Sequence, residues 1–159
     1  REKFMQKTNA MRFLDDLDIN YDILEYNSSD GKIDGISVAE KIGHSVDMVY
    51  KTLVLKGENI FVCIVPVQEE IDLKAMAKAI KEKKVEMIHV KDILTLTGYV
   101  RGGCSPFAMK KKYPTYIQED IILQDEIIVS GGKIGIQIKL KVEDFLKVSE
   151  AQVVDVISK

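Results

Sequence analysis

Short helical and extended patterns of hydrophobic residues alternate along the whole chain. A first helix is predicted over residues 8–17, with Thr8 or Asn9 as its N-cap. Residues 21–26 are predicted to form a strand, and residues 28–35 a polar, turn-rich loop. The apolar positions of the helix recur at helical spacing and are expected to face a core: Ala10, Phe13, Leu14 and Leu17.

The next part of the chain predicts a short helix followed by a β-hairpin. Ser37-Val38-Ala39-Glu40 fits a capping box, and Gly43 is expected to end that helix after about two turns. Strands are predicted over residues 50–55 and 60–65, joined by Gly57-Glu58-Asn59. The second strand is apolar throughout, so we expect both of its faces to be covered.

The second half of the chain continues the alternation. Asp72 is expected to cap a helix that reaches about Lys81, with four residues facing inward: Leu73, Met76, Ala77 and Ile80. Further strands are predicted at 85–88, 115–117, 126–129, 135–140 and 153–156, and helices at 91–96 and 142–148. About seven strands with scattered helices predict a single α+β domain over residues 1–159, with a curved, mixed, barrel-like sheet and flanking helices.

Composition fits one compact domain and limits the kind of partner. The chain has 159 residues, of which 46% are hydrophobic and 30% charged, a balance that disfavours general disorder. With 23 basic and 25 acidic residues, the formal net charge is −2. This charge disfavours broad binding to long nucleic acids, although a local basic patch could still hold one RNA end.

Neither a metal site nor a membrane span is expected. Cys63, Cys104, His44 and His89 have no ligand-like spacing, so we expect no zinc, no cofactor and no disulfide framework. No apolar run reaches the roughly 18 residues that a membrane span needs. Residues 1–4 lack the apolar core of a signal peptide, and the cytoplasm is therefore the expected location.

Two glycine-rich segments are candidates for a binding site. They cover residues 98–107 and 130–135, and the second directly follows a predicted strand. Glycine lets the backbone approach a ligand and leaves amide N–H groups free to stabilise an oxyanion. The alternative is that both segments are only tight turns between strands.

Lys51 is a second candidate because it lies on a predicted apolar strand. If Leu53 and Leu55 face the core, Lys51 lies on the same face, where a charge is costly unless it reaches a cleft or a partner. The alternative is a lysine whose ammonium extends to solvent at the end of the strand.

Two other features have competing interpretations. Cys104 is a candidate nucleophile if a neighbour such as Arg101 or His44 lowers its pKa, but small loop cysteines more often serve packing. The run Lys110-Lys111-Lys112 is typical of a solvated face, although beside a glycine loop it could contact phosphates.

Taken together, the ordered motifs resemble the YbaK/EbsC family of aminoacyl-tRNA deacylases, which is related to the editing domain of bacterial prolyl-tRNA synthetases. The resemblance extends over about residues 8–157 and is strongest to the free-standing branch that removes cysteine from tRNA for proline. Some residues differ from those usual in the family: Arg101 and Cys104 replace aliphatic residues, Ile134 a basic one and Gln137 an acidic one. The matching stretches are residues 49–53, 73–74, 77–79, 83–87, 97–99, 102–103, 105–106, 111–112 and 129–133.

The resemblance implies a site and a mechanism. Lys51 would be the essential polar residue of the pocket, and the amides of Gly98, Gly102 and Gly103 would stabilise the developing oxyanion. Further substrate-binding residues would be Tyr26, Thr52, Tyr99, Ser105, Ser130, Gly131, Gly132 and Lys133. In the cysteine-specific branch the thiol of the substrate is thought to attack its own ester, releasing a cyclic thiolactone and free tRNA.

The resemblance also leaves alternatives. One is a deacylase for alanyl-tRNA or another small aminoacyl-tRNA, and another is a non-catalytic module of the same fold that binds RNA or a synthetase. The expected partners are the 3′ acceptor end of an aminoacyl-tRNA and, through a transient complex, prolyl-tRNA synthetase. We expect a monomer.

Overall fold

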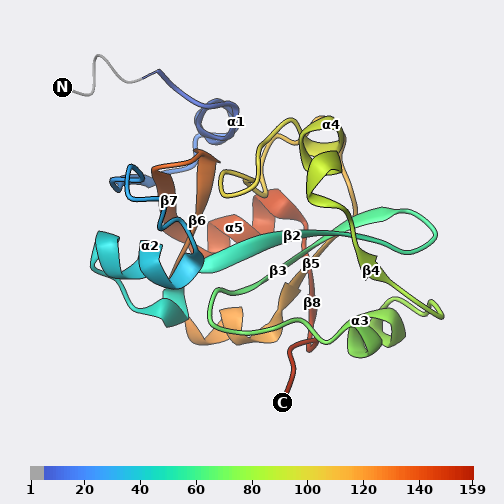
Figure 1. Cartoon of the computed structure of the whole chain (residues 1–159). Coiled ribbons are helices and arrows are strands. Elements are labelled where there is room, and N and C mark those ends of the chain that lie inside the picture. Colours follow the sequence, from blue (N-terminus) through green and yellow to red (C-terminus); the bar gives the residue numbers. More distant parts are fainter. Residues whose placement is uncertain (1–5) are drawn as a thin grey trace.

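Two β-sheets form the centre of the computed structural model, which describes residues 6–159 (Figure 1). The three-stranded sheet has the order β1-β7-β6, and the five-stranded sheet has the order β4-β2-β3-β5-β8. The first contains β1 (Asp22–Glu25), β7 (Ile136–Lys141) and β6 (Glu126–Lys133). The second contains β4 (Glu86–Met87), β2 (Tyr50–Lys56), β3 (Ile60–Pro66), β5 (Thr115–Gln118) and β8 (Gln152–Val154).

The strand pairing confirms the predicted α+β class with mixed sheets. Strand β2 pairs antiparallel with β3 and β4, whereas β5 pairs parallel with β3 and β8. The prediction of a barrel-like sheet is wrong in one respect, because the described strands do not close. A parallel bridge between Val49 and Ile128 links the two sheets, and the short strand β4 ends the larger sheet at an exposed edge.

Five α-helices and three 3-10 turns connect the strands of the described chain. In the view of Figure 1, α4 lies above the β2–β3 hairpin and β4 at its lower side, and α2 lies at the left near β6 and β7. The helices are α1 (Asn9–Asp16), α2 (Gly35–Ile42), α3 (Leu73–Ala79), α4 (Ile93–Thr97) and α5 (Val142–Ser149). The 3-10 turns are η2 (Val46–Met48), η3 (Val90–Asp92) and η4 (Glu119–Leu123). None of the helices in residues 6–159 is long and apolar enough to cross a membrane.

Helix ends follow local hydrogen bonding, and most of the predicted caps are confirmed. The Thr8 hydroxyl accepts from the Met11 amide, the Asp72 carboxylate caps α3, and Gly43 ends α2 in the left-handed region with φ 73°. Helix α2, however, begins before the predicted capping box. The carboxylate of Asp34 accepts from both the amide and the hydroxyl of Ser37, so Ser37 lies inside the helix.

Two residues that were predicted to face the core are instead exposed. Leu17 is 48% exposed because it is the C-cap of α1 and the chain turns away at Asp18, whose φ is 57°. Leu73 is 36% exposed because it is the first residue of α3 and precedes the inward face. Both errors arise at helix ends, where helical spacing no longer determines which face is covered.

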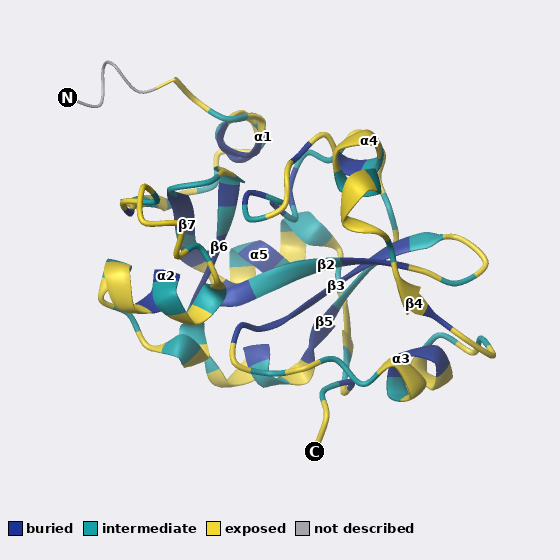
Figure 2. Cartoon of the chain, in the orientation of Figure 1, coloured by how far each residue is buried: buried dark blue, intermediate teal, exposed yellow. Residues whose placement is uncertain are grey.

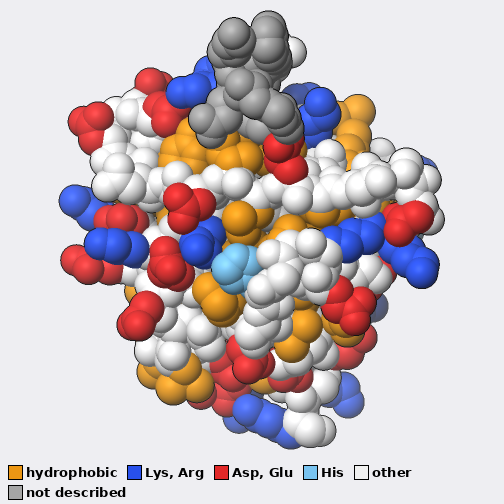
Figure 3. Space-filling view, turned by 90° about the vertical axis from the view of Figure 1, so that its left-hand side faces the viewer, with side chains coloured by type: hydrophobic (Ala, Val, Ile, Leu, Met, Phe, Trp, Pro, Cys, Tyr) orange, Lys and Arg blue, Asp and Glu red, His pale blue; other side chains and the backbone are white. Residues whose placement is uncertain are grey.

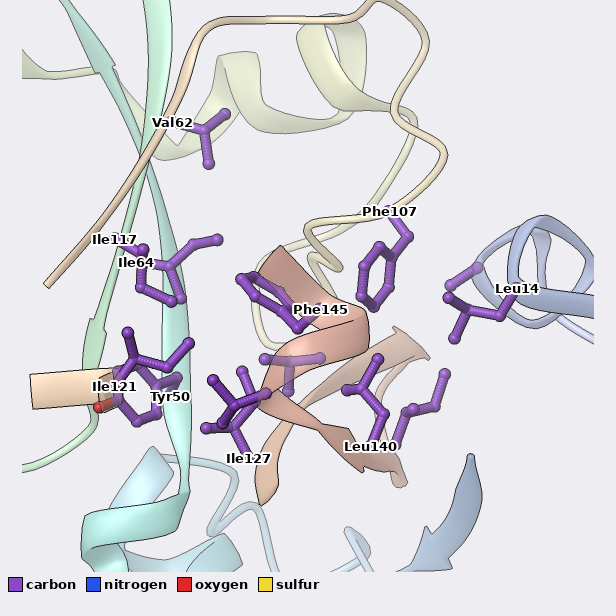
Figure 4. Close-up of a cluster of buried hydrophobic side chains, with 14 of the residues drawn as sticks. Leu14, Tyr50, Val62, Ile64, Phe107, Ile117, Ile121, Ile127, Leu140 and Phe145 are labelled. Carbon is purple, nitrogen blue, oxygen red and sulfur yellow. The ribbon is translucent and has the colours of Figure 1, made fainter. Parts of the chain in front are cut away.

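The largest hydrophobic cluster lies between the two sheets, α1 and α5 (Figures 2 and 4). At its centre, the ring of Phe107 lies 5.8 Å from that of Phe13 and 5.7 Å from that of Phe145. Phe107 belongs to the loop that follows α4, so burial of its ring fixes this loop against the core. A second cluster packs α3 against the five-stranded sheet and includes Leu55, Phe61, Cys63 and Met76.

Candidate functional site

A small cavity lies where the two sheets meet, and Lys51 lines it. The cavity has a volume of about 120 Å³. Side chains or backbone from both sheets, from α2 and from the loop after α4 form its wall. The lining residues are Ile33, Gly35, Val38, Val49, Tyr50, Lys51, Thr52, Val67, Gly102, Cys104, Ser130 and Gln137.

Lys51 reaches the cavity because of its place on β2. It shares a strand face with Leu53 and Leu55, which pack against the second hydrophobic cluster, and it is paired across the sheet with Val65. Its side chain is half-buried, and its ammonium makes no ion pair or hydrogen bond with residues 6–159. A partly desolvated cation without a partner favours an anionic or strongly polar ligand.

The three-stranded sheet supplies Ser130 and Gln137 to the same cavity. These two residues are directly paired across β6 and β7, so their side chains share one face of the sheet. Gln137 is only 6% exposed, and its side-chain amide has no hydrogen bond within the described part of the chain. The Ser130 hydroxyl accepts from the Gly132 amide at 3.2 Å and thereby supports the irregularity that follows it in β6.

The two glycine-rich segments pack against one another, as expected for parts of one site. A Cβ added to Gly103 would lie 3.0 Å from the amide nitrogen of Ile134 and 3.1 Å from the Cα of Lys133. Only glycine therefore permits this approach between two backbones. Gly102, which has a φ of +89°, follows the same loop and presents its backbone to the cavity.

Tyr99 and Ser105 support the loop from inside instead of contacting the cavity. The Tyr99 hydroxyl donates to the carbonyl of Phe107, and the Ser105 hydroxyl accepts from the Phe107 amide. Their exposed fractions are 6% and 0%, and neither lines the cavity. The structure gives both polar groups an anchoring role, because they hold the buried Phe107, and it does not bring them to the cavity that Lys51 lines.

Two of the three glycine amides predicted to stabilise an oxyanion are already bonded. The Gly98 amide donates to the carbonyl of Leu94 at 2.8 Å, and the Gly103 amide donates to that of Val100 at 2.9 Å. Each bond closes a turn, so neither N–H group is free for a ligand. The Gly102 amide has no acceptor among residues 6–159 and remains the candidate donor.

The other predicted substrate-binding residues lie outside the cavity wall. Tyr26 places its ring 5.8 Å from the Lys41 ammonium. Gly131 is buried beneath the side chain of Ile136, and Gly132 lies against the ring of Tyr99 and against Thr8. Lys133 is exposed. Gly131 and Gly132 lie within the irregularity of β6 that directly follows Ser130.

Thr52 and Tyr50 both line the cavity, and their hydroxyls are buried without a hydrogen-bond partner among residues 6–159. A buried, unsatisfied polar group costs about 1–3 kcal/mol. Burial raises the pKa of Tyr50, with the charges of Asp120 and Asp47 adding to the effect, so its hydroxyl keeps its proton. The Thr52 hydroxyl is therefore available to a polar ligand, whereas the Tyr50 ring lies in the hydrophobic cluster beside Ile121 (Figure 4).

Cys104 lies at the cavity, but its environment does not activate a thiolate. Burial raises the pKa of the thiol to about 11, and a hydrogen bond with Thr97 only partly opposes this shift. The thiol is therefore protonated at neutral pH. Neither His44 nor Arg101, its predicted activators, is among the causes of the pKa shift of this thiol. Within residues 6–159, no three histidine, cysteine or acidic side chains are grouped closely enough to hold a metal ion.

Comparison with known families agrees with this geometry. The profile of the aminoacyl-tRNA editing domain matches residues 35–148. The chain belongs to the aminoacyl-tRNA editing domain family. A candidate Cys-tRNA(Pro)/Cys-tRNA(Cys) deacylase, EbsC of Enterococcus faecalis, is 42% identical over 161 residues, covering 100% of this chain and 98% of the relative.

Solved structures share the fold of this editing domain. A candidate trans-editing enzyme for prolyl-tRNA synthetase has a TM-score of 0.85 at 21% identity, covering 98% of this chain and 100% of the other. The hypothetical protein APE2540 has a TM-score of 0.86 at 16% identity, covering 95% and 100%. At these identities the likeness establishes the architecture alone.

The surface of this editing domain has no large field of one sign on the face shown in Figure 3. Acidic and basic side chains are interspersed there, in line with the net charge of −2. Recognition of a polyanionic RNA by this face therefore gains little from long-range attraction.

Proposed function

We propose that the protein hydrolyses the ester of a mischarged aminoacyl-tRNA, with cysteinyl-tRNA for proline as its main substrate. The observation that carries the proposal is the Lys51 ammonium, unpaired within residues 6–159, in a cavity shared with Ser130, Gln137 and the Gly102 amide, which has no acceptor there either. These groups suit an ester carbonyl on which negative charge develops. The name of the 42% identical relative, a candidate Cys-tRNA(Pro)/Cys-tRNA(Cys) deacylase, supports cysteine as the amino acid.

The proposed reaction uses the nucleophile of the substrate itself. The cysteinyl sulfur bonds to its own ester carbonyl carbon, and the bond between that carbon and the ribose oxygen breaks. The thiol proton ends on the ribose oxygen, which leaves free tRNA and a cyclic thiolactone that water opens. Lys51 and Gly102 stabilise the charge on the carbonyl oxygen, while the cavity holds sulfur and carbonyl in attacking geometry.

This route agrees with the absence of an activated protein nucleophile at the cavity. The Cys104 thiol is held protonated by burial, and no histidine lines the wall. The cavity of about 120 Å³ suits a small side chain and disfavours large ones. The size of the cavity distinguishes amino acids of similar shape only weakly, since one methylene contributes about 1–3 kcal/mol to the discrimination. The reacting thiol of the substrate therefore adds selectivity that the cavity wall cannot provide.

A deacylation assay on one tRNA carrying four different amino acids tests the proposal. Cysteinyl-tRNA should be cleaved fastest, and seryl-tRNA, in which a hydroxyl replaces the thiol, should be cleaved at least tenfold more slowly. Alanyl- and prolyl-tRNA should remain largely intact, and thiolactone should be trapped from the cysteinyl reaction. If alanyl-tRNA is cleaved as fast as cysteinyl-tRNA, the protein is a deacylase for small amino acids in general. If none of the four is cleaved, the protein is a non-catalytic binding module.

We further propose that the protein acts as a monomer in the cytoplasm and obtains its tRNA through a transient complex with prolyl-tRNA synthetase. The net charge of −2 supports this view, because such a protein binds free tRNA weakly. The synthetase would supply the tRNA selectivity. Addition of prolyl-tRNA synthetase should therefore raise the deacylation rate at low tRNA concentration.

A further inference from the structure

A second cavity adjoins the one that contains Lys51. It has a volume of about 250 Å³ and shares Thr52, Gly102 and Cys104 with the first. Its lining residues come from β2, from the segment that runs from β4 to α4 and from the loop that follows α4. The two cavities thus meet at Thr52, Gly102 and Cys104, which form their common border, here called the common wall.

The walls of the second cavity are largely apolar, and one cation belongs to them. Leu53, Val54, Ile88 and Ile93 line it, all from β2 or the segment that carries β4 and α4. Arg101 also lines it and is exposed. Within residues 6–159 the Arg101 guanidinium makes no ion pair or hydrogen bond, so it is available to an anion.

We propose that this second cavity binds the 3′-terminal adenosine of the tRNA and that Arg101 binds the phosphate on its 5′ side. The inference rests on the proposed function, because it assigns a place to the nucleoside whose ribose carries the ester. With the ester carbonyl beside Lys51, the ribose lies at the common wall and its base enters the adjoining cavity. Apolar walls suit the faces of a nucleobase, and an arginine suits a phosphate.

The common wall carries a group that fits the ribose. Thr52 lines both cavities, and its hydroxyl is buried without a partner among residues 6–159. A ribose hydroxyl placed there would give it the hydrogen bond that it lacks.

The space continues beyond the second cavity, so the nucleotides that precede the adenosine have room. A third cavity of about 430 Å³ shares Met87 and Ile88 with the second and extends to Lys56 and Ile60 of the hairpin. The strand of RNA would therefore leave the site past the exposed edge strand β4.

Binding of adenosine 5′-monophosphate, compared with adenosine, tests the subsite without deacylation. In two-dimensional NMR titrations of the full chain, the nucleotide should shift the amides of Val54, Ile88 and Ile93 and bind at least fivefold more tightly than adenosine. Arg101→Ala should abolish the difference between the two ligands. The matched control Lys74→Ala removes an exposed cation on α3 and should retain it. Equal affinities in the unmodified protein, or shifts confined to other surfaces, would overturn the subsite.

A pair of matched valine variants tests the same subsite during turnover. Val90, which is 54% exposed, lines the second cavity, whereas Val153, which is 47% exposed, lies on β8. Val90→Asp places a negative charge beside the proposed phosphate and should raise the KM for cysteinyl-tRNA about tenfold with little change in kcat. Val153→Asp makes the same chemical change and should leave both constants unaltered. An unchanged KM in Val90→Asp would contradict the proposal.

The two proposals fail in different ways. A chain that cleaves cysteinyl-tRNA but does not distinguish the nucleotide from adenosine overturns the subsite alone. A chain that binds the nucleotide through Arg101 but cleaves no aminoacyl-tRNA overturns the deacylase function and leaves a nucleotide-binding cavity.

Discussion

Lys51 and Gln137 line one cavity from two different sheets, and neither side chain is bonded to another described residue. Gln137 thus adds a neutral amide to the cavity that contains the Lys51 ammonium. An acidic residue at position 137 would add a carboxylate instead. Because no acid neutralises Lys51 within the described chain, its charge remains available to the substrate. A free cation beside a neutral hydrogen-bonding group suits a reaction in which negative charge appears on an oxygen.

Replacing Lys51 tests this role directly. Lys51→Ala should lower kcat/KM for cysteinyl-tRNA by about a hundredfold or more, because loss of one preorganised charge-stabilising group has an effect of roughly this size. The fold should survive, since the ammonium has no structural partner among residues 6–159, and circular dichroism with urea unfolding will show this. Lys78→Ala, at an exposed position of α3, is the control and should retain the original rate. A Lys51→Ala variant as active as the original would remove Lys51 from the site.

Thr52→Val should separate stability from activity. The substitution replaces an unpaired, buried hydroxyl by a methyl group of similar size, so the free energy of unfolding should stay constant or rise by up to about 1 kcal/mol. Deacylation should weaken through a higher KM, because the ribose loses a hydrogen-bond partner. Urea unfolding and steady-state kinetics measure the two effects, and Thr52→Ser keeps the hydroxyl as a control. A clear loss of stability in Thr52→Val would mean that the hydroxyl is bonded in the folded protein.

Gly103→Ala should disturb the contact between the glycine-rich segments. The new methyl would meet the backbone of residues 133–134 at 3.0–3.1 Å, and backbone atoms yield less readily than the end of a side chain. We expect a loss of about 1–3 kcal/mol in the free energy of unfolding, the usual range for overpacking. The kcat should fall as well, since Gly102 moves with the loop. Unchanged unfolding and kinetics would show that the segments separate easily.

Stability should fall in alkaline solution because two thiols are buried. Burial raises the pKa of Cys104 from 9.0 to about 11 and that of Cys63 from 9.0 to about 12. Below pH 9 both states keep these protons, whereas above pH 9 the unfolded chain loses them first and is favoured. Between pH 9 and 11 the free energy of unfolding should therefore decrease, by roughly 1 kcal/mol per pH unit and group.

Urea unfolding under reducing conditions at pH 8, 9, 10 and 11 measures this dependence. Cys104→Ala removes one of the two thiols and should make the decrease less steep above pH 9. An identical pH dependence in the variant and the original protein would show that the Cys104 thiol ionises as easily in the folded state as in the unfolded one.

The position of Lys51 could be predicted because its evidence is local. Leu53 and Leu55 define the inward face of β2, and alternation along a strand places Lys51 on that face without knowledge of any other element. The same reasoning explains why the predicted hairpin and most caps are correct, since each depends on a few neighbouring residues. The prediction that the two glycine-rich segments belong to one site was not local, because it depended on the family resemblance as well.

The rest of the site depends on features that local patterns do not contain. Gln137 reaches the cavity because it pairs with Ser130 just before β6 becomes irregular, and this register is a property of two strands together. Glycine, tyrosine and serine in one loop do not reveal which of them bind a ligand. Tyr99 and Ser105 were assigned to the substrate, yet burial of Phe107 uses both of them as anchors.

The two sheets that line the cavity are linked by an isolated β-bridge between Val49 and Ile128. The separation of these sheets therefore follows the size of the side chains packed between them, including the distant ring of Phe145. Substitutions in that packing would widen or narrow the cavity by moving whole strands. Preference for one amino acid over another could thus drift during evolution while every residue that meets the substrate stays the same.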